Sequence, residues 1–153
     1  SMLAAERGRM LDSLTSSAGV EDDDGPEMMA WDDVRRLLKK GFDVGPHTVS
    51  HISLGIEGAE AVARELAESA RQLASQTGLV PHTCSYPYGG AIDVPAGVER
   101  GLRELGFLGA VTSTEGLVLP GCDVFRLPRL NVTGMHDGLA FESLVSGFTT
   151  WVK

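Results

Sequence analysis

The spacing of apolar side chains predicts four helices beyond residue 28. Residues 31–40 and 58–77 carry apolar side chains three or four positions apart, which places them on one face of each helix. Gly41 and Gly78 follow these two segments, as is usual at the ends of helices. Two shorter helices are predicted over residues 98–105 and 140–152.

Short apolar runs between the helices predict strands. They cover residues 42–45, 80–86 and 107–111, with a further extended segment at 124–132. Pro81 has no N–H to donate, so regular pairing of the second strand should begin only after it. Helices that alternate with strands indicate an α/β fold with a parallel sheet. A closed eight-stranded barrel typically needs ~250 residues, so we expect an open sheet or a partial barrel.

The chain of 153 residues has the size of one ordinary domain. Residues 1–28 are expected to form a helical segment around 3–16 followed by an acidic loop, and residues 29–153 to form the domain. The loop contains Glu21-Asp22-Asp23-Asp24 and ends at Gly25-Pro26. Carboxylates in such a loop are usually solvated rather than bound to a metal ion.

Composition excludes several classes of function. The net charge of −8 argues against nucleic acid or an anionic membrane as the main partner. The longest apolar runs are much shorter than the ~20 residues of a membrane-spanning helix, so no membrane span is expected. Cys84 and Cys122 are too few for a disulfide framework and are expected to be buried free thiols.

Two histidines follow the predicted strand at 42–45, in the segment Gly45-Pro46-His47-Thr48-Val49-Ser50-His51. Loops at the carboxyl ends of parallel strands are where α/β folds place their sites. If these residues form a helical turn, His47 and His51 share one face of it and their imidazoles can bind one zinc ion. Such pairs also arise by chance, so the spacing alone does not establish a metal site.

A second segment, Cys84-Ser85-Tyr86-Pro87-Tyr88-Gly89-Gly90, follows the strand that begins near residue 80. A Pro-Tyr-Gly-Gly sequence after a strand predicts a tight turn with exposed backbone N–H groups. Such groups can stabilise a negative charge that develops on an acyl oxygen. The alternative is a plain turn with two tyrosines at the rim of the core.

Taken together, the two segments resemble the polysaccharide deacetylases (the NodB-homology domain, carbohydrate esterase family 4). Residues 29–34 and 41–45, which lead to His47, resemble the approach to the histidine motif of that family. The helix with Arg64-Glu65-Leu66 and the later segments at 106–112 and 125–130 agree as well. The resemblance extends over about residues 29–153. It implies a partial or distorted (β/α) barrel of the deacetylase type, with too few strands for a full barrel.

The resemblance implies a chemistry. His47 and His51 match the ligands of zinc, or of another divalent transition metal, which activates water for attack on an acetyl group. The matching substrate-binding residues are Tyr86, Pro87, Tyr88 and Gly89. The backbone N–H of Tyr88 would be catalytic, because it would hold the oxyanion. The implied enzyme is a hydrolase of carbon–nitrogen bonds other than peptide bonds, and its substrate is an N- or O-acetylated polysaccharide or oligosaccharide.

The sequence departs from the family in several places. The Asp-Asp motif of the family lies on a strand well upstream of the histidines, whereas Asp23-Asp24-Gly25 lies in the acidic loop. We therefore expect this chain to be the C-terminal portion of the domain, incomplete and inactive alone. Ser85 stands where many relatives carry arginine. His136 is a candidate for the late catalytic general acid, with a surface-loop histidine as the alternative, and His82 is interpreted as structural.

Other functions remain open. The same fold could act as a non-catalytic module that binds glycans or self-associates through an open sheet edge. A serine acyl hydrolase is disfavoured, because Ser50 and His51 are adjacent and there is no G-x-S-x-G motif. The location of the protein is not indicated by the sequence. Relatives act on cell walls and exopolysaccharides, so the resemblance implies a cell-envelope or secreted protein.

Overall fold

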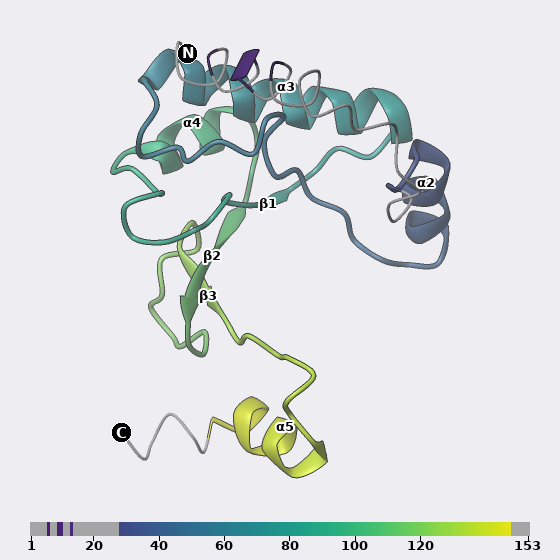
Figure 1. Cartoon of the computed structure of the whole chain (residues 1–153), viewed down its shortest axis with the longest axis vertical. Coiled ribbons are helices and arrows are strands. Elements are labelled where there is room, and N and C mark those ends of the chain that lie inside the picture. The colour runs from purple at the N-terminus through teal and green to yellow at the C-terminus, as the bar shows by residue number, and fades with distance from the viewer. Residues whose placement is uncertain (1–5, 7–8, 11–12, 14–27, 148–153) are drawn as a thin grey trace.

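The computed structural model describes residues 6, 9–10, 13 and 28–147, and it shows helices alternating with parallel strands (Figure 1). Most of the predicted helix at 3–16, the acidic loop and the end of the last predicted helix lie outside the described residues. The elements are α2 (Trp31–Lys39), α3 (Ala59–Thr77), β1 (Thr83–Ser85), α4 (Val98–Glu104), β2 (Gly109–Glu115), β3 (Leu127–Arg129) and α5 (Gly138–Val145). The predicted α/β class is confirmed.

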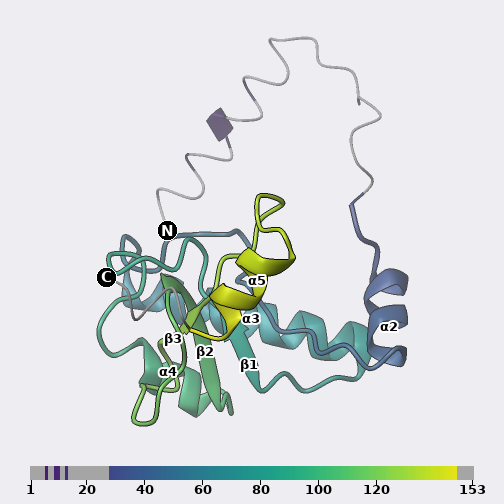
Figure 2. The ribbon, with the colours of Figure 1, turned by 90° about the horizontal axis from the view of Figure 1, so that it is seen from below.

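The sheet contains three parallel strands in the order β1-β2-β3, and they lie side by side in Figure 2. Thr83 is paired with Gly109 at the start of β1. Val111 is paired with Leu127, but the register shifts before Glu115 meets Arg129. Within the described part of the chain the sheet does not close into a barrel, as the small number of predicted strands indicated.

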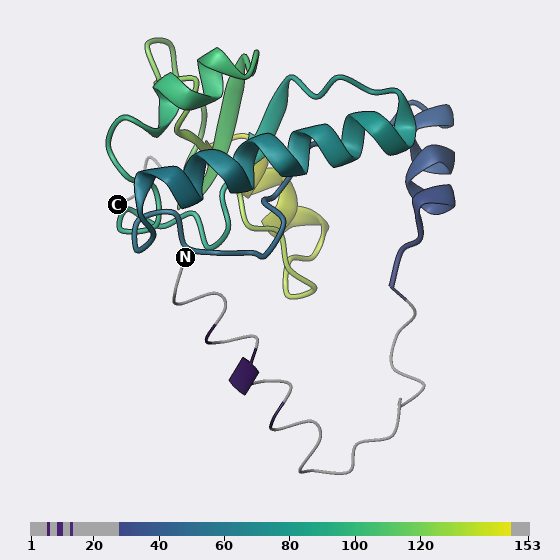
Figure 3. The same ribbon diagram turned by 90° about the horizontal axis from the view of Figure 1, so that it is seen from above.

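The helices α2 and α3 follow the boundaries predicted for residues 31–40 and 58–77 closely. Gly58 and Gly78 are the N-cap and C-cap of α3, which crosses the sheet in Figure 3. At the C-terminal end of α3, the Arg35 guanidinium on α2 donates to the carbonyl oxygen of Gln76. In all three views α2 accordingly lies beside that end of α3. None of the described helices is long and apolar enough to cross a membrane.

The core lies between the sheet and the helices α3 and α4. Its buried residues are Ile52, Leu54, Val62, Leu66, Cys84, Tyr86, Val94, Val98, Leu102, Phe107, Ala110 and Phe125. Both cysteines are free thiols, as predicted, but only Cys84 is buried, whereas Cys122 is half-buried. Burial raises the pKa of the Cys84 thiol to about 12, so this group stays protonated at neutral pH.

The predicted strand at residues 42–45 is wrong, since this segment is irregular in the structure. It approaches β1 at one backbone hydrogen bond, from Ser85 N–H to the Pro46 carbonyl (3.2 Å). Pro46 has no N–H to return a bond to β1, so a ladder cannot continue there. The strand predicted from residue 80 begins only at Thr83, after Pro81, as expected.

Replacing Leu102 should test the core, because this α4 side chain is 0% exposed. Leu102→Ala is expected to lower the free energy of unfolding by about 2–5 kcal/mol, through lost apolar burial and the cavity left behind. Leu108, which is 70% exposed, offers a matched control. Leu108→Ala should change stability by no more than about 0.5 kcal/mol. Equal losses for the two variants in urea denaturation would contradict this core.

Candidate functional site

Two loops meet beside the carboxyl end of β1. The first carries the two histidines and begins at Gly45, whose backbone lies directly against β1. A Cβ atom at position 45 would stand 2.5 Å from the carbonyl oxygen of Thr83, so only glycine permits this approach. Together with the hydrogen bond between Ser85 and Pro46, the contact places His47 next to Ser85.

The histidine loop is not a helical turn, so that part of the sequence prediction is wrong. Thr48 and His51 have positive φ angles of 65° and 50°, which an α-helix cannot contain. The imidazoles of His47 and His51 nevertheless lie edge to face, with 4.8 Å between their ring centroids. A loop with two left-handed residues therefore brings the rings together.

Ser85 determines which nitrogen of His47 is available. The Nδ1 atom of His47 lies 2.8 Å from the Ser85 carbonyl oxygen and 2.7 Å from Ser85 Oγ. A carbonyl oxygen can only accept, so this contact requires the proton to be on Nδ1. Nε2 then keeps its lone pair, and neutral imidazole in this form is a metal ligand.

The second loop turns sharply at Tyr88, which has a φ of 60°. Gly89 N–H donates to the Pro87 carbonyl (2.6 Å), which closes a three-residue turn. Ser113, on β2, fixes the turn: its hydroxyl donates to the Tyr88 carbonyl, and its N–H donates to the Gly89 carbonyl. A Cβ atom at position 89 would lie 2.6 Å from Ser113 N, so glycine is required there.

The turn places Tyr88 against the histidines. Its ring centroid lies 4.9 Å from that of His51, and its side chain is 57% exposed. Among the described residues the Tyr88 N–H donates to no acceptor. His47, His51 and Tyr88 thus form one continuous group at the end of β1.

The other residues predicted for the site are placed differently. Tyr86 is 1% exposed and donates its hydroxyl proton to the Phe125 carbonyl (2.9 Å), so its side chain belongs to the core rather than to a groove. Pro87 is also fully buried. His136 lies in the segment between β3 and α5, where its Nδ1 accepts from Thr133 N–H (3.0 Å). No interaction joins it to either site histidine within the described residues.

Two carboxylates to which the sequence analysis assigned no site role hold the loops. Glu65, on α3, accepts three hydrogen bonds from Val49 and Ser50, in the middle of the histidine loop. Asp93 accepts from the Ser53 hydroxyl (2.6 Å) and from Gly90 N–H (3.1 Å), so it ties the two loops together. The residues that bond Glu65, and Ser53, which bonds Asp93, are distant from these carboxylates in the sequence, and Gly90 lies across a turn from Asp93. No local sequence motif therefore indicates these bonds.

The donors present fit a divalent metal in part. The two imidazole rings lie close together, and the contact between Ser85 and His47 leaves Nε2 of His47 free. Among the described residues, however, no group of three or more His, Cys, Asp or Glu side chains could hold a metal ion together. The described residues therefore place two imidazoles and no carboxylate here.

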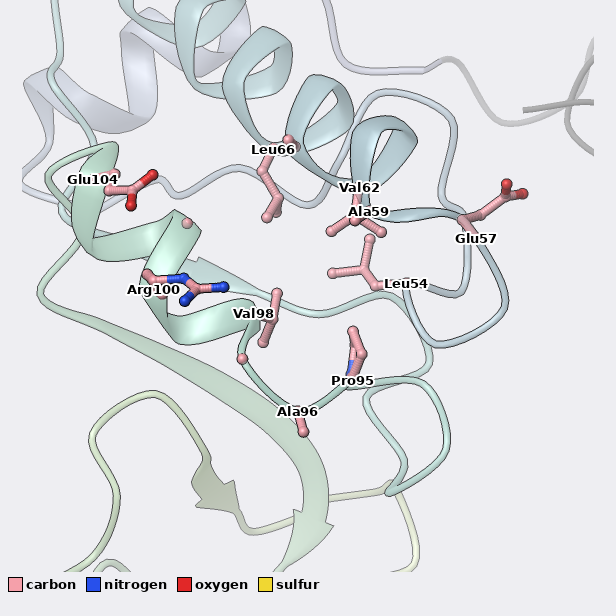
Figure 4. A pocket seen from close by; sticks show the side chains of 13 residues that line it. Leu54, Glu57, Ala59, Val62, Leu66, Pro95, Ala96, Val98, Arg100 and Glu104 are labelled. Atoms are coloured by element: carbon pink, nitrogen blue, oxygen red, sulfur yellow. The ribbon is translucent and has the colours of Figure 1, made fainter.

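Several hollows lie near these elements, and one of about 220 Å³ is lined in part by Gly45, Pro46 and Thr48 of the histidine loop. A cavity of about 370 Å³ is lined by α3, α4 and adjoining segments, with Leu54, Val62, Leu66 and Val98 pointing into it (Figure 4). None of the predicted site residues lines this cavity. A smaller hollow of about 310 Å³ adjoins the Tyr88 turn through Ser113, and its other lining residues are Arg129, Leu130 and Asn131.

Solved structures share this fold. A deacetylase from Streptococcus pyogenes in complex with acetate gives a TM-score of 0.72 at 16% identity, over 79% of this chain and 52% of that one. A polysaccharide deacetylase from Bacillus cereus gives 0.68 at 20% identity, over 80% and 38% of the two chains. A de-N-acetylase from Aggregatibacter actinomycetemcomitans gives 0.60 at 12% identity, over 76% and 53%. This chain therefore spans about half or less of the length of these structures.

No curated protein matches the sequence at a significant level. The model of the family described as "Polysaccharide deacetylase" matches residues 11–109, which is more than half of the chain. This match includes both histidines and the Tyr88 turn. The chain belongs to the polysaccharide deacetylase family.

Proposed function

We propose that this chain carries part of a site for the metal-dependent hydrolytic removal of acetyl groups from an N- or O-acetylated polysaccharide. The observation that carries the proposal is the contiguous group of His47, His51 and Tyr88, with ring centroids 4.8 and 4.9 Å apart. The family match supports the reaction class. The similar fold of a deacetylase solved with acetate is consistent with it.

His47 and His51 would hold zinc or another divalent transition metal. A catalytic zinc ion usually has three protein ligands, so one more ligand is needed beyond the two imidazoles. A carboxylate from outside the described residues is the group that the chemistry requires. A metal ion bound there would supply Lewis acidity, polarising the acyl carbonyl and making water acidic near neutral pH.

Tyr88 would act through its backbone. Its N–H makes no hydrogen bond among the described residues, and its ring lies beside that of His51, so this donor is available to the acyl oxygen of a substrate held near the histidines. A donor fixed in advance by the turn stabilises that charge without having to reorganise. Ser113 is what fixes the donor, because it holds both Tyr88 and Gly89.

The complete reaction also needs a base, and the described residues place no carboxylate beside the two imidazoles. We therefore expect this chain alone to release little or no acetate from acetylated oligosaccharides. A role for His136 as general acid stays a prediction, since its described contacts are to Thr133.

A zinc titration of the metal-stripped chain by calorimetry tests the metal site. We expect one zinc ion per chain, and we expect His47→Ala and His51→Ala each to abolish binding, because each removes one of the two imidazoles. His82→Ala is the matched control, since His82 is exposed just before β1 and its loss should leave binding unchanged.

The outcomes separate the parts of the proposal. Binding that persists in both site variants would refute the histidine pair as a metal site. Stoichiometric binding that both variants lose would show that the chain supplies the remaining ligand, with the acidic loop as a candidate. Absence of binding in a folded wild-type chain would mean that two imidazoles alone do not retain the metal.

A non-catalytic glycan-binding or self-associating module is the second candidate. The exposed Tyr88 ring and the adjoining hollow at Ser113 favour glycan binding, because aromatic faces and polar side chains both suit sugars. Self-association is suggested by β3, which has a neighbour on one side only within the described sheet. Unpaired strand edges are templates for pairing with another chain.

Light scattering coupled to size-exclusion chromatography tests self-association. If the β3 edge pairs with a second copy, the apparent mass should rise with protein concentration from that of one chain towards that of two. Val132→Pro, just beyond β3, should leave the rise unchanged if pairing is confined to residues 127–129. A constant monomer mass over the whole concentration range would argue against a self-associating module.

A further inference from the structure

We propose that Glu65 is a positioning residue, which holds the histidine loop so that the imidazoles of His47 and His51 converge on one metal ion. The inference rests on the proposed function, which makes those imidazoles metal ligands. Glu65 itself forms no described contact with either ring, so it acts through the loop and not on the reaction.

The geometry is a three-point attachment. Oε2 of Glu65 accepts from Val49 N–H (2.8 Å) and Ser50 N–H (2.9 Å), and Oε1 accepts from the Ser50 hydroxyl (2.9 Å). Val49 and Ser50 lie between the two histidines. The acceptor belongs to α3, whose inner face packs in the core, so the attachment links the loop to a rigid element.

The loop needs such an attachment because its backbone is strained. Thr48 has a φ of 65°, which is unfavourable for a β-branched residue, and His51 has a φ of 50°. Conformations of this kind persist only where the surrounding structure determines them. The positive φ angles lie on either side of Val49 and Ser50, the two residues that Glu65 binds.

An ionised carboxylate suits this position, because it is an acceptor at both oxygens and two backbone N–H groups and one hydroxyl converge on it. A glutamine could keep all three contacts, since its oxygen can accept both N–H groups and its NH₂ can donate to the Ser50 hydroxyl oxygen. Removal of the attachment therefore requires an apolar side chain at position 65. Partial burial acts to raise the pKa of Glu65, but the hydrogen bonds from Ser50 and Val49 outweigh burial and lower it, so the group is ionised at neutral pH.

The other contacts of the histidines indicate which ring depends most on Glu65. His47 is also held by Ser85 through Nδ1, independently of the loop. The described contacts of His51 are with the rings of His47 and Tyr88. Release of the loop should therefore displace His51 more than His47.

The test compares Glu65→Ala with Glu68→Ala in the full chain, because alanine removes the acceptor oxygens altogether. Glu68 lies three residues further along α3, and its carboxylate bonds Arg71 and Gln72 on the same helix, so it is a matched control. Circular dichroism first establishes that both variants are folded. Zinc affinity by calorimetry should then fall about 10–100-fold in Glu65→Ala, as is typical when a group that orients metal ligands is lost. It should stay within about twofold in Glu68→Ala.

A second measurement needs no metal. In the NMR spectrum of the metal-free chain, nuclear Overhauser effects between the ring protons of His47 and His51 should be present in the wild type and in Glu68→Ala. They should be lost in Glu65→Ala, together with the hydrogen-bonded shifts of the Val49 and Ser50 amides. Glu65→Leu, which also has no acceptor, should repeat the loss and decides the question if the alanine variant does not fold.

The two measurements distinguish the possible failures. If wild-type chain binds no zinc, the metal site of the proposed function is not formed by this chain, and the NMR comparison still decides the role of Glu65. Ring contacts that persist in folded Glu65→Ala would overturn the inference. So would an unchanged zinc affinity in that variant, or equal losses in Glu65→Ala and Glu68→Ala.

Discussion

The chain that carries the histidines touches β1 at one place, where Gly45 lies against Thr83 and Ser85 N–H donates to the Pro46 carbonyl. Glycine allows the backbones to approach, and the proline that follows ends the pairing after one bond. The chain therefore leaves β1 at its carboxyl end. His47 therefore lies beside Ser85, and the ring contacts of His51 and Tyr88 continue from His47.

The rest of the site is held by polar side chains from the surrounding elements. Ser113 fastens the Tyr88 turn to β2, Glu65 fastens the histidine loop to α3, and Asp93 joins the two loops through Ser53. The loops have no helix or strand hydrogen bonds of their own, so these side-chain bonds hold their backbones instead. Left-handed residues at three positions can persist because these bonds fix the backbone around them. A site built in this way is largely ordered before any ligand arrives.

Sequence reasoning succeeded where the information is local. The helices at 31–40 and 58–77 were predictable because apolar periodicity and a following glycine lie within one segment. The prediction of a strand at 42–45 was wrong because a strand needs a paired neighbour. Here the contact with β1 is limited to one hydrogen bond, since Pro46 has no N–H to donate. Tyr86 and Tyr88 look equivalent in sequence, yet the turn between them buries the first and exposes the second.

The same limit applies to the site. The spacing of His47 and His51 indicated that their rings could meet, but it suggested a helical turn, whereas the structure has a loop with positive φ angles. Glu65 could not be recognised, because its role depends on Val49 and Ser50, which follow the first histidine and are brought to α3 only by folding. The resemblance to the deacetylases supplied what local spacing could not, namely that the two loops belong to one site.

The unequal burial of the two cysteines has a practical consequence. Cys84 is enclosed in the core and stays protonated, whereas Cys122 is half-buried in the loop between β2 and β3. A thiol-specific reagent should therefore modify one position of the native chain and two positions of the unfolded chain. The number of labels per molecule then reports opening of the core, and a fluorophore at Cys122 gives a single reporter position on the loop that connects two strands of the sheet.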